Sequence, residues 1–123
     1  MADNKQYVTQ TRDNGNIMIS EDVIATIVSH AIKEVEGVAG MSVKPGADII
    51  DLIGKKSGAK GMKILIGEED ELYIDCNINI FYGQSIVTVA QSVQEVVTAA
   101  LQSTGGFKVA AVNVNVCGIV RQQ

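Results

Sequence analysis

Apolar and polar residues alternate along residues 72–82, which is the period of a β-strand with one buried face. A charged turn at residues 68–71 separates this segment from a shorter apolar segment at residues 62–67, so the two segments are predicted to form an antiparallel hairpin. The two faces of the longer strand are Leu72, Ile74, Cys76, Ile78 and Ile80 on one side, and Tyr73, Asp75, Asn77, Asn79 and Phe81 on the other.

Two other segments place apolar residues at steps of three and four, which is the period of an amphipathic helix. The first begins after Ser20, a good N-cap residue, and we expect Gly37 to end it in a left-handed conformation. The second spans about residues 85–103. The expected apolar stripes are Val23, Ile24, Ile27, Val28, Ala31 and Val35 in the first helix, and Ile86, Val89, Ala90, Val93, Val97, Ala100 and Leu101 in the second.

Three further strands are expected at residues 17–19, 38–44 and 107–120, which gives the order β-α-β-β-β-α-β. Both helices are joined to strands by short links, so right-handed crossovers would place them on the same side of the sheet. We therefore predict an α+β two-layer sandwich, with one mixed sheet of about 4–5 strands and two helices on one face. Residues 1–14 are expected to be a flexible lead-in, and residues 15–120 a single domain.

The composition restricts the class of function. A length of 123 residues fits one domain, and a net charge of −4 argues against general binding of nucleic acid. No apolar run approaches the ~18 residues of a membrane span, and the polar N-terminus lacks the apolar region of a signal peptide. We expect a cytoplasmic protein without a transmembrane segment.

The reactive side chains do not form a recognisable catalytic or metal site. Cys76 and Cys117 lack the spacing of metal ligands, and we expect both to be free, buried thiols. His30 lies at the margin of a helical stripe and is expected to be a half-exposed structural residue. The carboxylates of residues 68–71 lack the spacing of a calcium loop. The sequence therefore predicts no catalytic residue, no cofactor and no metal.

A loop rich in lysine and glycine precedes the hairpin. Its basic residues are Lys55, Lys56, Lys60 and Lys63, and residues 58–61 match the GXXG pattern with which KH modules clamp a nucleic-acid backbone. The helical context of a KH module is missing, since a strand is expected from Met62, and no Walker motif is present. A flexible surface loop is the favoured interpretation, and contact with an anion or an acidic partner is the alternative.

Asparagine is concentrated on the predicted polar side of the sheet. Asn77 and Asn79 lie on one strand and Asn113 and Asn115 on another, near Tyr73. Asparagine has a poor strand propensity, so this concentration suggests a flat polar surface to which a partner docks. The alternative is that these are tolerated solvent-facing residues.

Several ordered motifs resemble those of a known family. They are residues 15–24 (GNIMISEDVI), residues 31–40 (A-x-x-E-V-x-G-V-x-G), Tyr82-Gly83, residues 89–94 (V-A-x-x-V-Q) and residues 112–119 (VNVNVCGI). On these motifs the chain resembles the alkaline shock protein family of Gram-positive bacteria, whose members are also described as general or envelope stress response proteins. The resemblance covers about residues 15–120. The Lys/Gly loop matches no motif of the family.

The resemblance implies a small cytosolic protein without known catalysis. Some members associate with the inner side of the membrane through a membrane-anchored partner, and others act beside lipid synthesis. The leading hypothesis is a self-associating, non-enzymatic scaffold or adaptor of the envelope stress response. The alternatives are a regulatory module that acts on a lipid-synthesis enzyme and, less favoured, an RNA-binding module that uses Lys55, Lys56 and Lys60.

Overall fold

The described part of the chain, residues 7–41 and 61–121 of a computed structural model, alternates strands and helices. The elements are β1 (Tyr7–Arg12), β2 (Gly15–Ser20), α1 (Glu21–Lys33), β3 (Val38–Met41), β4 (Met62–Ile66), β5 (Glu71–Phe81), α3 (Ile86–Gly105) and β6 (Lys108–Val120). The strand expected at residues 38–44 is described only as far as Met41, and residues 42–60 lie outside the described residues.

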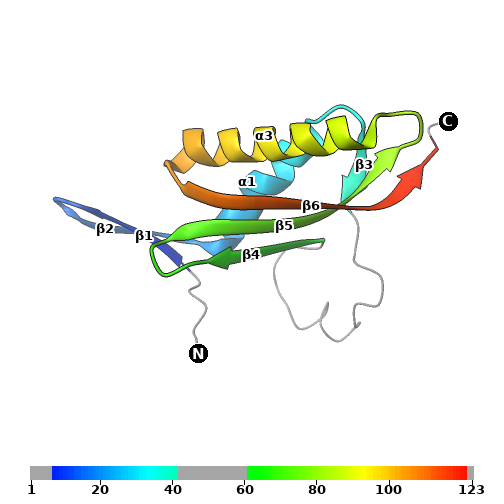
Figure 1. Cartoon of the computed structure of the whole chain (residues 1–123). Coiled ribbons are helices and arrows are strands. Elements are labelled where there is room, and N and C mark those ends of the chain that lie inside the picture. The colour runs from blue at the N-terminus through cyan, green and yellow to red at the C-terminus, as the bar shows by residue number, and fades with distance from the viewer. Residues whose placement is uncertain (1–6, 42–60, 122–123) are drawn as a thin grey trace.

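The main sheet is built around β5. Strand β6 pairs with one edge of β5 in parallel over its whole length. The other edge is shared by two antiparallel strands, because β4 pairs with residues 72–76 and β3 with residues 78–80. This is the mixed sheet that the sequence predicts (Figure 1).

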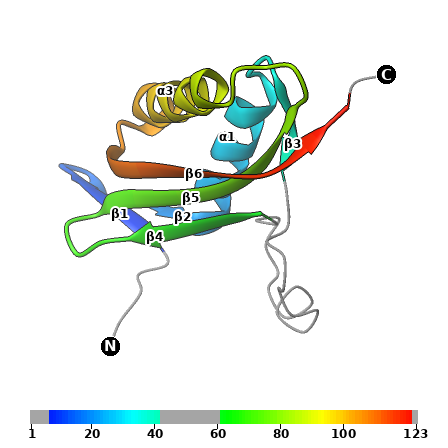
Figure 2. The same cartoon turned by 45° about the vertical axis from the view of Figure 1, so that its right-hand side comes forward.

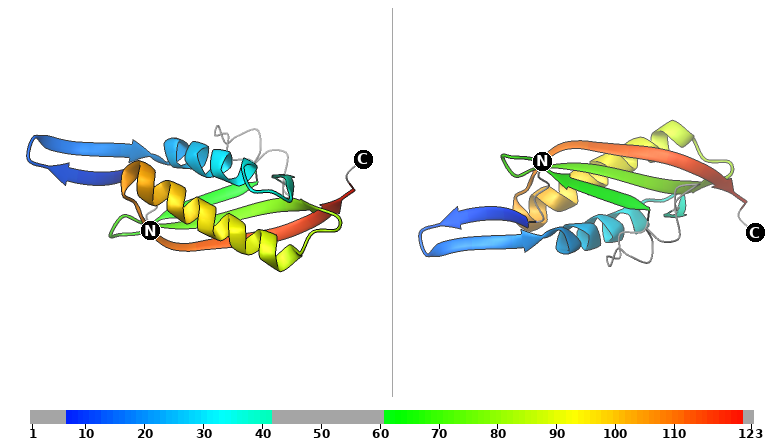
Figure 3. Two further views of the ribbon diagram at one scale, coloured as in Figure 1. Left: turned by 90° about the horizontal axis from the view of Figure 1, so that it is seen from above. Right: turned by 90° about the horizontal axis from the view of Figure 1, so that it is seen from below.

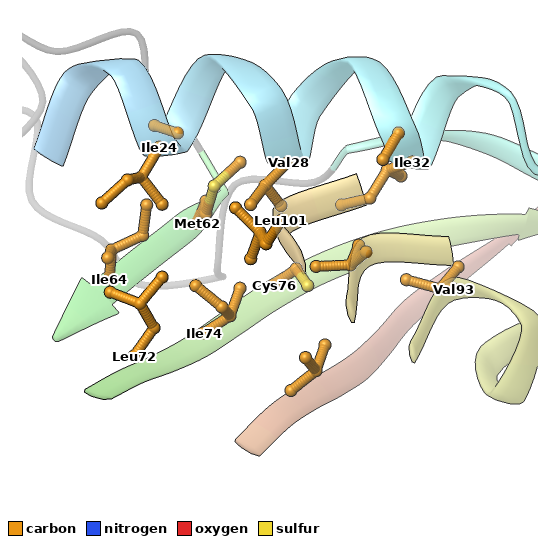
Figure 4. Packing of buried hydrophobic residues seen from close by; sticks show 14 of the residues in the cluster. Ile24, Val28, Ile32, Met62, Ile64, Leu72, Ile74, Cys76, Val93 and Leu101 are labelled. Atoms are coloured by element: carbon orange, nitrogen blue, oxygen red, sulfur yellow. The ribbon is translucent and has the colours of Figure 1, made fainter. Parts of the chain in front are cut away.

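Both helices lie on the same side of the main sheet, as Figures 1 and 2 show. The core between the layers is aliphatic, with Ile24, Val28 and Ile32 of α1 facing residues of β4, β5 and α3 (Figure 4). Views from above and below show that no described element covers the opposite side of the sheet (Figure 3). The α+β two-layer architecture is therefore confirmed.

The β1–β2 hairpin forms a separate two-stranded sheet that projects from the main body (Figure 3). This corrects two expectations, because residues 7–12 were assigned to the flexible lead-in and residues 17–19 to the main sheet. Val8 is only 3% exposed, and the side-chain amide of Gln10 donates to the backbone carbonyl of Gly105 over 2.7 Å. Such long-range contacts hold a strand whose own residues are mostly polar, so local periodicity did not indicate it.

Helix α1 begins as predicted and ends earlier. The hydroxyl of Ser20 accepts a hydrogen bond from the Val23 amide over 3.4 Å, but the C-cap is Glu34 and not Gly37. Gly37 serves a different purpose, since it adopts a φ of 100° and a Cβ there would lie 2.8 Å from Cγ2 of Val89 on α3. The glycine therefore permits close contact between the start of β3 and α3.

The apolar stripes of the two helices are shifted from those expected. Val23 is 49% exposed, while Ile32, which was not assigned to the stripe, is fully buried. Ile86 at the start of α3 is 45% exposed, because this end of the helix extends beyond the sheet (Figure 3). Helix α3 ends at Gly106 in the left-handed region, with a φ of 65°.

Candidate interaction surface

The side of the main sheet opposite the helices, here termed the open face, carries the predicted asparagines. The register places Asp75 of β5 beside Asn113 of β6, and Asn77 beside Asn115. On the other edge of β5, Lys63 of β4 is in register with Asp75. The alternation that buries Leu72 through Ile80 in the core turns these polar residues away from it.

Asn115 connects the two strands through its side chain. Its Nδ2 donates to Oδ1 of Asp75 over 2.7 Å and to Oδ1 of Asn77 over 2.9 Å. One amide group thus bridges two acceptors, which restricts the rotamers of three neighbouring side chains. The centre of the open face is therefore ordered before any partner arrives, which lowers the entropy cost of docking.

Tyr73 lies at the end of the open face near the β4–β5 turn and is 39% exposed. Its hydroxyl donates to Oε2 of Glu71 over 3.2 Å, while Oε1 of Glu71 accepts from the Glu69 amide over 2.9 Å. The pKa of Glu71 is lowered, first by hydrogen bonding from its own backbone N–H and further by these two donors. The same hydroxyl–carboxylate bond raises the pKa of Tyr73, because it favours the protonated phenol.

Asn79 sits where the pairing of β5 and β6 becomes irregular. The register shifts between Ile78 and Asn79, so that Asn79 faces Gly118 and Cys117 is skipped. A Cβ on Gly118 would lie 2.9 Å from Oδ1 of Asn79, so the asparagine side chain leans across β6 at the point where that strand has no side chain. The backbone irregularity ends the regular polar array.

The five predicted surface residues therefore lie on two neighbouring strands. The structure joins Asn77 and Asn115, places Asn113 beside Asp75, and sets Tyr73 and Asn79 toward the two ends. Asp75 was not selected from the sequence as a candidate, although it accepts the shortest bond of the array. The alternation of buried and polar residues in β5 could have shown from the sequence that Asp75 faces away from the core.

Of the four lysines of the predicted Lys/Gly loop, only Lys63 is described. It is exposed on β4. Lys55, Lys56 and Lys60 lie outside the described residues.

The two cysteines differ in environment. Cys76 is fully buried, and burial, with a smaller contribution from the charge of Asp75, raises its pKa to about 12. Cys117 is exposed, which corrects the expectation that both thiols are buried, because the alternation of β6 places it with Asn113 and Asn115 on the side away from the core. His30 is exposed rather than half-exposed.

Metal-binding clusters and membrane-spanning helices are both missing from the part of the chain that the structure describes. Within residues 7–41 and 61–121, no group of three or more His, Cys, Asp or Glu side chains could hold a metal ion. Neither α1 nor α3 is long and apolar enough to cross a membrane.

Comparison with known proteins identifies the family. The chain is 31% identical to the uncharacterized protein YqhY of Bacillus subtilis, over 97% of this chain and 89% of that protein. It is 31% identical to YloU of the same organism over 85% and 88% of the two chains, and 34% identical to Spy1614 of Streptococcus pyogenes over 89% and 90%. A solved variant of the MamM CTD aligns with 82% of this chain and 94% of its own at 14% identity and a TM-score of 0.46.

A family profile matches almost the whole domain. Residues 9–121 match the alkaline shock protein 23 family, which is described by a cell envelope-related function. This range begins inside β1, in agreement with the ordered β1–β2 hairpin. The motifs at residues 15–24 and 112–119, on which the resemblance rests, both lie within it. The chain therefore belongs to the alkaline shock protein family, whose function is related to the cell envelope.

Proposed function

We propose that this protein is a non-enzymatic scaffold or adaptor of the envelope stress response, which self-associates and is held at the cytosolic side of the membrane by a protein partner. The observation that carries the proposal is the open face of the main sheet. Both described helices cover the other side, while an ordered array of amide and carboxylate groups stays uncovered by any described residue.

The chemistry of the open face suits a protein partner better than a nucleic acid. Asp75 and Glu71 place carboxylates on it, and the whole chain has a net charge of −4, so a polyphosphate backbone would be repelled. Asparagine side chains offer both donors and acceptors to a polar partner surface. Tyr73 adds an aromatic ring of the kind that is enriched in protein interfaces.

The absence of enzymatic activity is supported by the state of the reactive groups. The thiol of Cys76 is buried and its pKa is raised to about 12, so it stays protonated at neutral pH. The described residues contain no metal-binding cluster. Glu71 and Tyr73 interact at the surface beside a turn, where water is not excluded.

Binding to inside-out membrane vesicles from a Gram-positive bacterium tests the partner. The purified full chain should sediment with native vesicles, fail to sediment with vesicles of the extracted lipid alone, and lose binding after the native vesicles are treated with protease. Asn115→Arg, which places a bulky cation at the centre of the open face, should weaken sedimentation at least tenfold.

Gln91→Arg is the matched control, because Gln91 is exposed on α3, on the other side of the molecule. It adds the same charge and should bind like the wild type. Equal binding of the two variants would reject the open face as the docking surface. Binding to the lipid vesicles would replace the protein partner by the bilayer itself.

A further inference from the structure

No described strand pairs with the outer edge of β6. Strand β6 pairs with β5 on one side only, and it is 13 residues long. Edge strands are usually protected by charged residues, proline or bulges. Residues 109–120 contain no charged residue or proline, and the two register irregularities leave residues 111–116 regular, so this central stretch is suited to pairing with another strand.

The backbone groups that point outward can be identified. Along a strand, each residue sends its N–H and C=O to one side and the next residue sends them to the other. The side chain of Gln94 on α3 donates to the carbonyl of Val112 over 3.0 Å, so the backbone N–H and C=O of Val112 point away from β5. The alternation then directs the backbone N–H and C=O of Val114 and Val116 outward as well.

The centre of β6 has a sequence that is symmetric about Val114. Residues 112–116 (VNVNV) read the same in both directions. The two irregularities of the β5–β6 register, at residues 109–111 and 116–118, lie on either side of this centre. Antiparallel pairing of two copies about Val114 therefore sets valine against valine, asparagine against asparagine, and one irregular stretch against the other.

We propose that a second copy of this chain pairs with the outer edge of β6, antiparallel and about a two-fold axis at Val114. This deepens the self-association in the proposed function, on which it rests, by naming the surface. Val114 then faces its own copy, and Val112 faces Val116 of the second copy. The Val112 carbonyl, which already accepts from Gln94, would use its second lone pair for the Val116 N–H of the second copy. The main sheet and the open face continue across the axis, with Asn113 of one copy beside Asn115 of the other.

The dimensions suit a stable dimer. Strand β6 is about 43 Å long at ~3.3 Å per residue. Helix α3 is about 30 Å long and crosses above β6 at an angle (Figure 3), so it raises the ~10 Å edge of the sheet by a further ~10 Å over at most that length. The edge of sheet and helix together is at most about 730 Å², near the ~800 Å² that each partner of a standard interface buries. Ile119, which is 46% exposed, would pack against Val109 of the second copy.

Sedimentation equilibrium of the full chain is the first test. The wild type should be a dimer, and Val114→Pro should raise the dimer dissociation constant at least tenfold, because it removes an outward N–H without removing a bond to β5. Val114→Ala keeps that N–H and should stay dimeric. Circular dichroism must show that each variant is folded.

Oxidative cross-linking is the second test and does not depend on the proline variant. In a Cys117→Ser background, Val114→Cys should form a disulfide-linked dimer, since directly opposed Cα atoms lie ~5.5 Å apart, within disulfide range. Val112→Cys alone should not, because its two copies would lie on opposite sides of the axis. A monomeric wild type, or a dimer in which Val112→Cys cross-links and Val114→Cys does not, would overturn the inference.

The vesicle assay separates this inference from the docking proposal. A monomeric Val114→Pro that still binds native vesicles supports both, because the edge and the open face then act independently. A monomeric wild type that binds the vesicles overturns only the edge pairing. A cross-linked dimer that does not bind them overturns only the docking partner.

Discussion

At the scale of single residues, contacts between packed elements determine roles that the local sequence pattern does not specify. Gly37 illustrates this, because its place after an apolar helical stripe suggested a helix cap, while its contact with Val89 of α3 could be known only from the fold. Ile32 illustrates it again, since it lies beside the expected stripe and is fully buried. Periodicity locates the buried face of a helix only to within about one residue. The element that packs against the helix decides which of the neighbouring residues is buried.

Gly37→Ala should destabilise the protein by about 2–4 kcal/mol, because a positive φ and a side-chain overlap act together. Both effects are present at this position, with a φ of 100° and a Cβ 2.8 Å from Cγ2 of Val89. Urea denaturation of the full chain measures the free energy of unfolding.

Gly83→Ala is the control for the backbone effect alone. Gly83 has a φ of 97°, yet nothing lies within 4 Å of its virtual Cβ, so this variant should lose only about 1–2 kcal/mol. Equal losses at the two sites would contradict the packing role of Gly37.

At the scale of elements, the β4–β5 turn shows how a charged surface segment is organised. Glu71 accepts from its own segment and from Tyr73, and Asp70 adopts a positive φ of 64° to close the turn. The run of acidic residues was predicted to be a solvated hairpin turn, which its position confirms. The hydrogen bonds within it follow from backbone geometry that the residue types alone do not specify.

The pKa shift of Glu71 predicts a dependence of stability on pH. A carboxyl group whose pKa is lower in the folded state contributes stability above its unfolded pKa, and this contribution is lost as the pH falls through the folded value. Glu71→Gln should therefore lower the melting temperature at neutral pH, and the difference from wild type should shrink below the ordinary value of 4.5.

Thermal melts between neutral and acidic pH would show this trend. Glu95→Gln, a surface change of the same charge on α3, is the control for net charge. A difference at Glu71 that stays constant with pH would exclude the carboxylate bonds as its source.

At the scale of the whole molecule, the layered architecture was predictable and one of its parts was not. Alternation in β5 and helical periodicity in α1 and α3 are strong local signals, and the handedness of the β5–α3–β6 connection agrees with the place of α3. The same argument does not apply to α1, because β2 lies outside the main sheet. The β1–β2 hairpin was missed because its burial rests on Val8 and on a bond from Gln10 to a residue 95 positions away. The asparagine positions were predictable from strand alternation, whereas the bridge from Asn115 to Asp75 required the strand register.

Thiol labelling under native conditions follows from the same layering. Cys117 is exposed and should react rapidly with a thiol reagent, while Cys76 lies between the layers and should react only when the core opens. The labelling rate of Cys76 in a Cys117→Ser variant should therefore rise with urea in parallel with global unfolding. Rapid labelling of two thiols per folded chain would contradict the burial of Cys76.

The parallel pairing of β5 with β6 has a consequence for biosynthesis. A nascent chain emerging from the ribosome exposes β5 and its neighbours long before α3 and the last described strand have been translated. Until then, one whole edge of the central strand lacks its hydrogen-bonding complement, and Val112 cannot fill its place in the core. Completion of the fold is thereby postponed until β6 has left the ribosome, which makes a polypeptide stalled or truncated before that point a substrate for chaperones and proteases.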